Sequence, residues 1–492
     1  MNNLDQLTDF NRKWMRTPTA AVLRNEPPLV VDLDGTLLRT DVLVESILQL
    51  VKTEPLAALC MPAWALRGRA RFKRRVSEHV PVDAELLPYR EDLLEYLREQ
   101  HAAGRSLVLA TGADMRVAEA IASHLGLFDR VLASDGETNL TGERKRGRLR
   151  ELYGDGGFDY AGDSSRDLPV WSSARRAILV DPFPRLQRAV TRRTEIETIF
   201  TRTPPSARVQ FGALRVRQWV KNVLIAVPLL AALRFDETGL FVSVLLAILA
   251  FGLCASGSYI LNDLLDLPSD RRHPRKRHRP FAAGVLPLRW GLTRFPALIL
   301  GGLSVGFVLP SPFDSILVVY LCLTLLYSLF VKTVPMLDVI VLSSLYTLRI
   351  MAGAAAVDIW PSHWLLGFST FLFLSLAMVK RYGELTTIGD RTATFRGYRV
   401  EDEALLVAFG TASGYLAVLV LALYIATDTA AVYYTRYQLI WLICPMLLYW
   451  ISHIWLTAHR QSLDDDPLVF ALTDPTSRLI LLATAAVFAA AI

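Results

Sequence analysis

The feature that most constrains the fold of this chain is a series of apolar segments in its C-terminal half. One of them, from Leu240 to Leu261, is long enough to cross a bilayer. Nine candidate spans are present, centred near residues 227, 250, 300, 322, 346, 371, 415, 447 and 484. Residues 1 to about 210 have the polarity of a soluble protein, although 52% of all 492 residues are hydrophobic. The sequence therefore predicts a soluble domain followed by an all-α, multi-pass membrane domain.

Charged residues in the loops predict how the chain crosses the membrane. Cytoplasmic loops of membrane proteins carry an excess of Arg and Lys. Such an excess is found in the loops at 262–290, 331–335, 380–403 and 458–476. The intervening loops, at 235–238, 358–362 and 427–438, hold little positive charge. We therefore expect an integral membrane protein with its N-terminal domain and its active sites in the cytoplasm. The membrane that we predict is a bacterial inner membrane.

The remaining composition excludes several classes of function. The net charge of +6 is modest for this length and no nucleic-acid recognition motif is present, so the expected partners are anionic substrates or lipids, and no nucleic acid. The four cysteines have no metal-ligand spacing and are expected to act as small apolar residues. No cleavable signal peptide is predicted, because Met1 to Arg16 is polar and lacks an apolar core.

An acidic and basic segment, Asn262 to Arg279, follows directly on one of the apolar runs. At about 100° per residue, Asp263, Asp266 and Asp270 would share one side of a helix, where their oxygens can converge on one cation. Mg²⁺ is the expected ion, because it binds through carboxylates and substrate phosphates. The Arg/Lys cluster offers partners to phosphate oxygens, or else it only sets topology. Pro268 removes a helical hydrogen bond, so a kink can also displace Asp270.

Other polar residues are predicted to gather at the same membrane face. They include Lys380-Arg381-Tyr382-Gly383-Glu384, Asp390-Arg391 and Arg396-Gly397-Tyr398-Arg399 after the sixth span, and Asp464-Asp465-Asp466 after the eighth. Asp338 and Arg349 lie within an apolar span, where ionisable groups are costly and commonly functional; the alternative is an internal ion pair. A site that binds a metal ion, a phosphate and a lipid would need acidic and basic side chains close together at one membrane face.

The N-terminal domain has the pattern of an α/β protein. Apolar strands at 29–31 and 106–110, and a third that ends at Gly162, alternate with helical stretches at 92–100 and 114–125. This alternation predicts a doubly wound parallel sheet. Polar residues follow each of these strands, which is the edge where such folds bind ligands.

Acidic and basic residues at this edge form four separated motifs. Asp32 and Asp34 follow the first strand at alternate positions, so both point the same way and can address one phosphate. Thr111 follows the second strand. The remaining motif residues are Lys145, Asp163 and Asp167.

In type and order these motifs resemble the haloacid dehalogenase superfamily, which consists mostly of phosphatases, across about 150 residues. The resemblance implies that Asp32 is the nucleophile that takes the phosphoryl group and that Asp34 is the general acid and base. It also implies that Thr111 and Lys145 hold the phosphate. The Mg²⁺ ligands that it implies are Asp32, Asp34, Asp163 and Asp167.

An insertion at about 41–90, between the first two motifs, has helical periodicity and is predicted to form a cap over the site. Its basic run, Arg67 to Arg75, would admit an anionic substrate, touch anionic lipid headgroups or form a solvated helix face. The phosphatase-like domain is predicted at 1–205 and the membrane domain at 206–492. A second interpretation of the first domain is a fold that has lost activity and serves as a scaffold.

The membrane domain resembles the UbiA superfamily of intramembrane prenyltransferases over about 215–492. The resemblance rests on the pattern Asn262-Asp263-x-x-Asp266-x-x-x-Asp270 after the second span. Motifs similar to the decaprenyl-phosphate phosphoribosyltransferase branch are Arg217-Gln218-Trp219-Val220-Lys221-Asn222, Arg277-x-Arg279-Pro280-x-Ala282-x-Gly284 and Lys380-Arg381-Tyr382-x-Glu384-Leu385. Members that move a prenyl group usually have a second Asp-x-x-x-Asp motif after span six, where this chain has Glu384 and Asp390 at another spacing. The departure disfavours an aromatic prenyltransferase.

The resemblance implies that Asp263 and Asp266 are catalytic and that both bind Mg²⁺ together with Asp270. The substrate-binding residues predicted from these motifs and the inner loops are Arg217, Lys221, Asn262, Arg277, Arg279, Lys332, Lys380, Arg381, Glu384 and Arg399.

The function predicted from both resemblances is that of a bifunctional membrane enzyme. Its membrane domain would transfer 5-phosphoribosyl from phosphoribosyl pyrophosphate (PRPP) to a polyprenyl phosphate with Mg²⁺, and its N-terminal domain would remove the 5-phosphate. An alternative is the transfer of a prenyl group from a polyprenyl diphosphate to an aromatic or other acceptor. A third, non-catalytic interpretation is a docking module for a cell-envelope complex. The sequence leaves the oligomeric state open, including a homo-oligomer.

Overall fold

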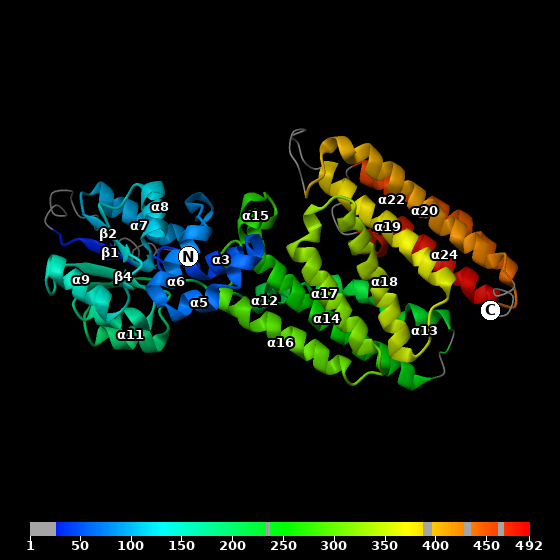
Figure 1. Ribbon diagram of the computed structural model, residues 1–492, viewed down its shortest axis with the longest axis horizontal. Helices are drawn as coiled ribbons and strands as arrows, with labels where there is room; N and C mark the ends of the chain where they lie inside the picture. The colour runs from blue at the N-terminus through cyan, green and yellow to red at the C-terminus, as the bar shows by residue number, and fades with distance from the viewer. Residues whose placement is uncertain (1–25, 233, 235–236, 387–395, 428–433, 461–466) are drawn as a thin grey trace, which may run out of the picture. The chain divides into compact units, whose positions relative to one another are not determined.

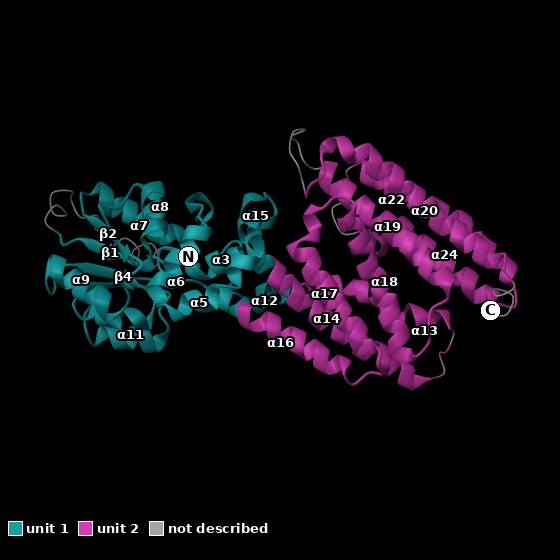
Figure 2. Cartoon of the chain, viewed as in Figure 1, with its two compact units in different colours: residues 1–213, 263–291 teal, residues 214–262, 292–492 magenta. Residues whose placement is uncertain are grey.

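Two compact units make up the protein, for which a computed structural model describes residues 26–232, 234, 237–386, 396–427, 434–460 and 467–492. Unit 1 comprises residues 1–213 with 263–291, and unit 2 comprises residues 214–262 with 292–492 (Figure 2). The polar loop at 263–291 thus belongs to unit 1, although it lies between two segments of unit 2 in the sequence. The predicted domain boundary at 205/206 stays a prediction.

Unit 1 is built on a six-stranded parallel sheet with the order β3-β2-β1-β4-β5-β6. The strands are β1 (Leu29–Val31), β2 (Leu107–Asp114), β3 (Arg130–Ser134), β4 (Asp159–Gly162), β5 (Arg176–Val180) and β6 (Glu195–Phe200). Leu29 lies opposite both Leu107 and Asp159, so β1 is central and is bonded on both sides. The predicted parallel α/β sheet is confirmed.

Helices cover both faces of this sheet (Figure 1). Leu29 and Val31 pack in one apolar cluster with side chains of α7 (Glu91–Ala102) and α8 (Met115–Leu125). Val30, which alternates with them, packs in a second cluster on the opposite face. The helices of that face are α9 (Glu143–Tyr153), α10 (Leu168–Trp171) and α11 (Pro184–Thr191). Burial on both faces explains why β1 is uninterruptedly apolar.

The segment predicted to be a cap is helical. Its helices are α3 (Val42–Thr53), α4 (Pro55–Ala58), α5 (Met61–Leu66) and α6 (Arg69–His79), followed by the short 3-10 helix η1 (Ala84–Leu86). Leu50, Ala58 and Val76 form a small apolar core of their own. Asp41 caps α3 by accepting a hydrogen bond from the backbone N–H of Val44.

The rest of the described chain is helical. Its elements are α12 (Ala207–Ala213), η3 (Val216–Ala226), α13 (Val227–Ala231), α14 (Thr238–Leu265), α15 (Leu267–Arg272), η4 (Lys276–His278), α16 (Leu288–Gly306), α17 (Phe313–Leu329), η5 (Val331–Thr333), α18 (Leu337–Val357), α19 (His363–Thr386), η6 (Val400–Asp402), α20 (Glu403–Ile425), η7 (Tyr437–Leu442), α22 (Ile443–His459), α23 (Pro467–Thr473) and α24 (Pro475–Ala491).

All nine predicted span centres fall within helical elements, but nine spans are not confirmed. In the described residues, five helices are long and apolar enough to cross a membrane, or six if α23 and α24, bent by 78°, form one span. The segment near residue 227 is divided between η3 and the five-residue α13, and α17 has only 17 residues. These elements are shorter than the length of about 20 residues that a straight span needs.

Helix α18 is the most enclosed of the candidate spans, with 67% of its apolar window buried. It packs against α17, α19 and η3. The close approach to η3 depends on Gly353, where a Cβ atom would lie 1.9 Å from the backbone oxygen of Ile225. Small residues allow such approaches between membrane helices.

Substitution Gly353→Ala should therefore destabilise unit 2. Forcing η3 away from α18 should cost about 1–3 kcal/mol, as overpacking does. The temperature at which the detergent-solubilised protein loses its monodisperse size-exclusion peak should fall by about 5 °C. Gly383→Ala in α19 is the matched control, because nothing lies within 4 Å of its added Cβ. Equal transition temperatures for the two variants would contradict this account of the packing.

Candidate active sites

A group of carboxylates lies where β1 and β4 end. One oxygen from each of Asp32, Asp163 and Asp167 lies within 4.8 Å of the others, which is a donor set that can hold a metal ion. Asp32 follows β1 and Asp163 follows β4, and these strands are neighbours in the sheet. The sheet thus joins two motifs that are far apart in sequence. Hard oxygen donors of this kind fit Mg²⁺.

Lys145 supplies positive charge to this group from α9. Its Nζ atom donates to Asp32 at 2.7 Å and to the Tyr160 hydroxyl at 2.9 Å, and lies 3.6 Å from Asp167. Tyr160 in turn donates to Asp167 at 2.8 Å. The sequence prediction missed Tyr160, whose place on β4 just before Asp163 was the available signal. The hydroxyl of Tyr160 and the ammonium of Lys145 therefore both orient the carboxylates of Asp32 and Asp167.

Burial shifts the acidity of this site. It raises the pKa of Asp32 to about 6, against the opposing effect of Lys145, and raises the pKa of Asp163 to about 8. Burial alone would lower the pKa of Lys145, but Asp32 and Asp167 outweigh it and the pKa rises. One lysine therefore faces three carboxylates, and a bound cation would offset the remaining negative charge.

Asp34 lies beside this group without joining the metal-ligand set in the described residues. One of its oxygens accepts from the backbone N–H of Val42 at 2.8 Å. Burial, followed by the charge of Asp41, raises the pKa of Asp34 to about 8. A carboxyl group that is protonated near neutral pH can donate a proton. Gly35, which follows Asp34, has φ +79°, and a Cβ there would lie 2.3 Å from a carboxylate oxygen of Asp163.

Two threonines and a cap lysine complete the edge. Thr111 is fully buried within β2, just where the pairing with β3 changes register, and its hydroxyl accepts from the backbone of Ala113. Thr36 is also buried, and its hydroxyl has no hydrogen-bond partner among the described residues. Lys73, from α6, donates to the carbonyl oxygen of Gly112 at 2.5 Å and to Asn139 at 2.8 Å. The cap therefore brings a cation next to Thr111.

The acidic loop after α14 is arranged differently from its prediction. Arg279 donates through one nitrogen to Asp263 at 3.1 Å and to Asp270 at 2.7 Å. Asp266 instead pairs with Lys52 of α3, at 2.8 Å. The three acids therefore do not share one helix, as their spacing predicted, because α14 ends at Leu265, Asp266 precedes α15 and Asp270 lies within α15. Their role as metal ligands stays a prediction.

This loop is bound to the cap within unit 1. Arg271 donates to both carboxylate oxygens of Glu45, at 2.6 and 2.8 Å, and both side chains are nearly buried. Gln49 donates to the backbone oxygen of Leu265 at 3.0 Å. Arg202 donates to the carbonyl oxygens of Gly284 and Val285. The acidic loop and the hydrolytic edge are therefore parts of one compact unit.

A buried ion-pair cluster lies in unit 2. Arg381 pairs with Asp338 at 2.6 Å and also bonds Glu384. Tyr398 donates to Asp338 at 2.5 Å. Tyr327 accepts hydrogen bonds from Arg381, at 3.4 Å, and from Arg396, at 3.0 Å. Arg381 is only 1% exposed, so its charge is committed to these partners.

The alternative of an ion pair between Asp338 and Arg349 is wrong. Arg349 donates to Asn222 at 3.1 Å and to the hydroxyl of Tyr320 at 3.2 Å. Lys221 lies over the ring of Tyr346, at 5.7 Å. The two intramembrane charges thus have separate partners, which come from helices far apart in the sequence.

The other predicted substrate-binding residues are more dispersed. Lys332 donates to Asn262 at 3.5 Å, and Lys380 is half-buried in α19. Those with exposed side chains are Arg217, Arg277 and Arg399. Asp390, Arg391 and Asp464 to Asp466 lie outside the described residues. Within unit 2 the structure brings Lys332 to Asn262 and Arg381 to Glu384.

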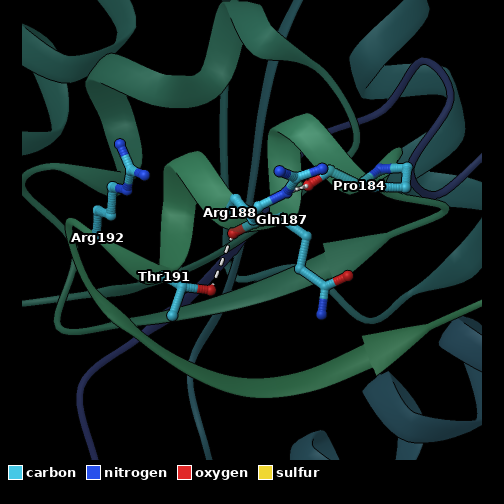
Figure 3. A pocket seen from close by; sticks show the side chains of 5 residues that line it. All are labelled: Pro184, Gln187, Arg188, Thr191 and Arg192. Atoms are coloured by element: carbon cyan, nitrogen blue, oxygen red, sulfur yellow. Dashed lines mark hydrogen bonds between the residues drawn. The ribbon is translucent and has the colours of Figure 1, made fainter.

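A hollow on the surface of α11 is separate from all of these groups. It has a volume of about 450 Å³ and is lined by Pro184, Gln187, Arg188, Thr191 and Arg192 (Figure 3). Thr191 and Arg188 bond the backbone of their own helix, to Gln187 and Pro184. No carboxylate lines it, so it gives no reason to place chemistry there.

Two family models match the chain in succession. Residues 29–172 match the haloacid dehalogenase-like hydrolase model, and residues 223–474 match the UbiA prenyltransferase family model. Both resemblances predicted from the motifs are confirmed. Both families consist of enzymes, and the apolar helices make this an integral membrane protein.

Similar proteins include one of matching length. Uncharacterized protein y4nM of Sinorhizobium fredii is 37% identical over 94% of this chain and 91% of that protein. Nodulation protein NoeC of Azorhizobium caulinodans is 36% identical over 56% of this chain and 90% of that protein. Decaprenyl-phosphate phosphoribosyltransferase of Mycobacterium tuberculosis is 40% identical over 37% of this chain and 63% of that protein. This chain thus belongs to the UbiA prenyltransferase family and carries a haloacid dehalogenase-like hydrolase domain ahead of its membrane domain.

Proposed function

We propose that this protein transfers 5-phosphoribosyl from PRPP to a polyprenyl phosphate and then removes the 5-phosphate with its hydrolase domain. One observation carries the proposal. The carboxylates of Asp32, Asp163 and Asp167 lie in the same compact unit as the acidic loop at 263–291, which the sequence assigns to the membrane domain. Similarity to a phosphoribosyltransferase supports the choice of donor. We further propose that residues 1–205 and 206–492 are the two functional domains.

In the first reaction, an oxygen of the lipid phosphate would attack C1 of the ribose while the bond to pyrophosphate breaks. Positive charge develops on the ribose carbon and negative charge on the leaving pyrophosphate. Arg279 would offer its guanidinium to this anion, since it already binds Asp263 and Asp270. Lys332 and Asn262 would hold the lipid or sugar phosphate. Arg381 would position Asp338 and Glu384 and would not bind substrate directly, because its charge is buried among them.

In the second reaction, Asp32 would attack the phosphorus of the 5-phosphate and displace the ribose oxygen. Asp34, with its raised pKa of about 8, would give that oxygen a proton. Asp34 would then take a proton from the water that hydrolyses the aspartyl-phosphate. Lys145 would bind the phosphoryl oxygens, because its ammonium already contacts Asp32. The products are the lipid-linked ribose and inorganic phosphate.

Mg²⁺ would take part in both reactions. Asp32, Asp163 and Asp167 would hold one ion in the hydrolase domain. Asp263, Asp266 and Asp270 would hold another at the acidic loop, as the sequence predicts. The ions would neutralise negative charge on phosphoryl and pyrophosphate oxygens. The hydrolase domain and both active sites would lie on the cytoplasmic side of the membrane, as the charge of the loops predicts, and the membrane would be a bacterial inner membrane.

The second candidate function is transfer of a prenyl group from a diphosphate to another acceptor. The match to the UbiA prenyltransferase model favours it. The two functions can be distinguished by the labelled donor from which radioactivity passes into the lipid product. Purified protein given labelled PRPP with a polyprenyl phosphate should form labelled lipid, whereas a labelled prenyl diphosphate with an aromatic acceptor should not react.

Substitution Asp32→Asn should make the phosphorylated lipid-linked ribose accumulate. The amide keeps the shape of the carboxylate but cannot form the aspartyl-phosphate, so the second reaction stops while the first continues. Mass spectrometry of the lipid products would detect the retained phosphate. Asp155→Asn, at an exposed site, is the control and should give the dephosphorylated product. Equal amounts of the phosphorylated species from wild type and Asp32→Asn would refute coupled hydrolysis.

Substitution Asp263→Asn should abolish the first reaction alone. Loss of a carboxylate that holds the pyrophosphate-bound ion should lower transfer by about a hundredfold or more. Hydrolysis of a soluble phosphate ester should stay at the wild-type rate, because Asp32, Lys145 and Asp34 are unchanged. Glu401→Gln, at an exposed residue, is the control for transfer. Equal loss of both activities would indicate a single composite site in place of two.

Substitution Lys73→Met should weaken substrate binding to the hydrolase domain. We expect Lys73 to bind the phosphate near Gly112, and the loss of one charged hydrogen bond should raise KM about tenfold or more. The value of kcat should change less, since Lys73 touches no acid of the metal group. Arg75→Gln, on the exposed side of α6, is the matched control. A fall in kcat at constant KM would contradict a binding role.

A further inference from the structure

The cap exposes an unusual amount of apolar surface. Among the described residues up to 213, five large apolar side chains are strongly exposed, and three of them fall between residues 56 and 66. Leu56 is 81% exposed, Leu59 is 77% exposed and Leu66 is 90% exposed. The other two, Phe183 and Phe211, are isolated in the sequence. Clustered apolar side chains at a surface mark an interaction site.

Basic residues follow directly on this apolar stretch. Arg67, Arg69 and Arg71 are exposed, and none has an ion-pair partner among the described residues. Arg67 and Arg71 line a groove of about 380 Å³ together with Trp64, two further arginines and two acids, Glu78 and Glu137. We call Leu56, Leu59, Leu66, Arg67, Arg69 and Arg71 the cap patch. Aliphatic side chains next to unpaired arginines are typical of segments that lie in the interface of an anionic bilayer.

The cap patch is attached to the point where a candidate span ends. Lys52, near the end of α3, pairs with Asp266, and Gln49 bonds the backbone oxygen of Leu265, the last residue of α14. Helix α4 begins at Pro55, so Leu56 follows Lys52 closely along the chain. Within unit 1, the cap patch is therefore linked to the end of α14, where this candidate span continues into the acidic loop.

We propose that the cap patch docks on the anionic lipid surface of the membrane in which the protein is embedded. Leu56, Leu59 and Leu66 enter the headgroup boundary, and the three arginines bind lipid phosphates. A protein partner is disfavoured because arginines left unpaired need anionic groups in quantity, which a charged bilayer supplies. Helix α6 carries Arg69 and Arg71 as well as Lys73, which bonds the carbonyl oxygen of Gly112. Docking thus brings the entrance of the hydrolase site to the lipid headgroups.

A spin label on Cys60 can test this proposal in the full chain. Cys60 is exposed between Leu59 and Leu66, and Cys322→Ser removes the other exposed thiol, because Cys254 and Cys444 are buried. The labelled protein is placed in nanodiscs of phosphatidylcholine alone, or with phosphatidylglycerol added. Collision with oxygen reports contact with lipid, and collision with a water-soluble nickel complex reports contact with water. We expect the oxygen-to-nickel ratio to rise in the anionic discs.

Substitutions within the cap patch should reverse this effect. Arg67→Gln and Arg71→Gln should each lower the ratio of docked to undocked label about fivefold, which corresponds to about 1 kcal/mol per basic residue near an anionic surface. Leu59→Glu with Leu66→Glu should leave the label water-exposed in both kinds of disc. Arg148→Gln, on the exposed face of α9, should have no effect.

A second label position separates docking from a general effect of the disc. Glu151→Cys in a background with Cys60→Ser and Cys322→Ser places the label on exposed α9, which should stay water-accessible in both discs. A Cys60 label that is equally water-accessible in both discs would overturn the proposal. A Cys60 label shielded from oxygen and nickel alike, whatever the lipid charge, would overturn it in favour of a protein partner. The readout is position and not turnover, so it stands apart from the proposed reactions.

Discussion

The carboxylate of Glu45 is the contact on which the joining of the two predicted sites depends. It accepts two hydrogen bonds from Arg271 of the acidic loop and one from Thr40, at 2.5 Å, while it is only 7% exposed. Thr40 in turn accepts at its backbone oxygen from the N–H of Gly35, which directly follows Asp34 of the first motif. Leaving one partner of a buried ion pair unpaired costs about 3–5 kcal/mol. The loop and the cap therefore move as one body, or separate at a substantial cost.

Different cations balance the carboxylates at the two sites. In the hydrolase domain, Lys145 faces Asp32 and Asp167 with a compact ammonium that leaves carboxylate oxygens facing one another. At the acidic loop, Arg279 bridges Asp263 and Asp270 with a single guanidinium nitrogen. Burial raises the pKa of Asp270 in spite of this arginine. In the hydrolase domain three carboxylates thus face one lysine, which is the condition that favours cation binding.

Local patterns in the sequence predicted the sheet and the residues at its edge, because alternation and strand ends fix where Asp32 and Asp163 lie. They could not predict contacts between segments far apart in the chain, such as Asp338 with Arg381 or Lys52 with Asp266. Helical phasing failed at Asp266 because the helix is interrupted there. Hydropathy located all nine helical segments, but nine spans are not confirmed: only five or six of the described helices are long and apolar enough, and length depends on where each helix ends.

The connection through Glu45 has a thermodynamic consequence for the two sites. Helix α3, which carries Glu45 and Lys52, belongs to the cap, and the same helix binds Arg271 and Asp266 of the acidic loop. A ligand that moves the cap must either move the loop with it or weaken these ion pairs, because the ion pairs join the cap to the loop. Linkage then requires the effect to be reciprocal, so a ligand on the loop alters affinity at the hydrolase edge by the same factor. In the proposed scheme of two reactions in sequence on one lipid, such coupling would let the product of the first site favour the cap position that admits it to the second.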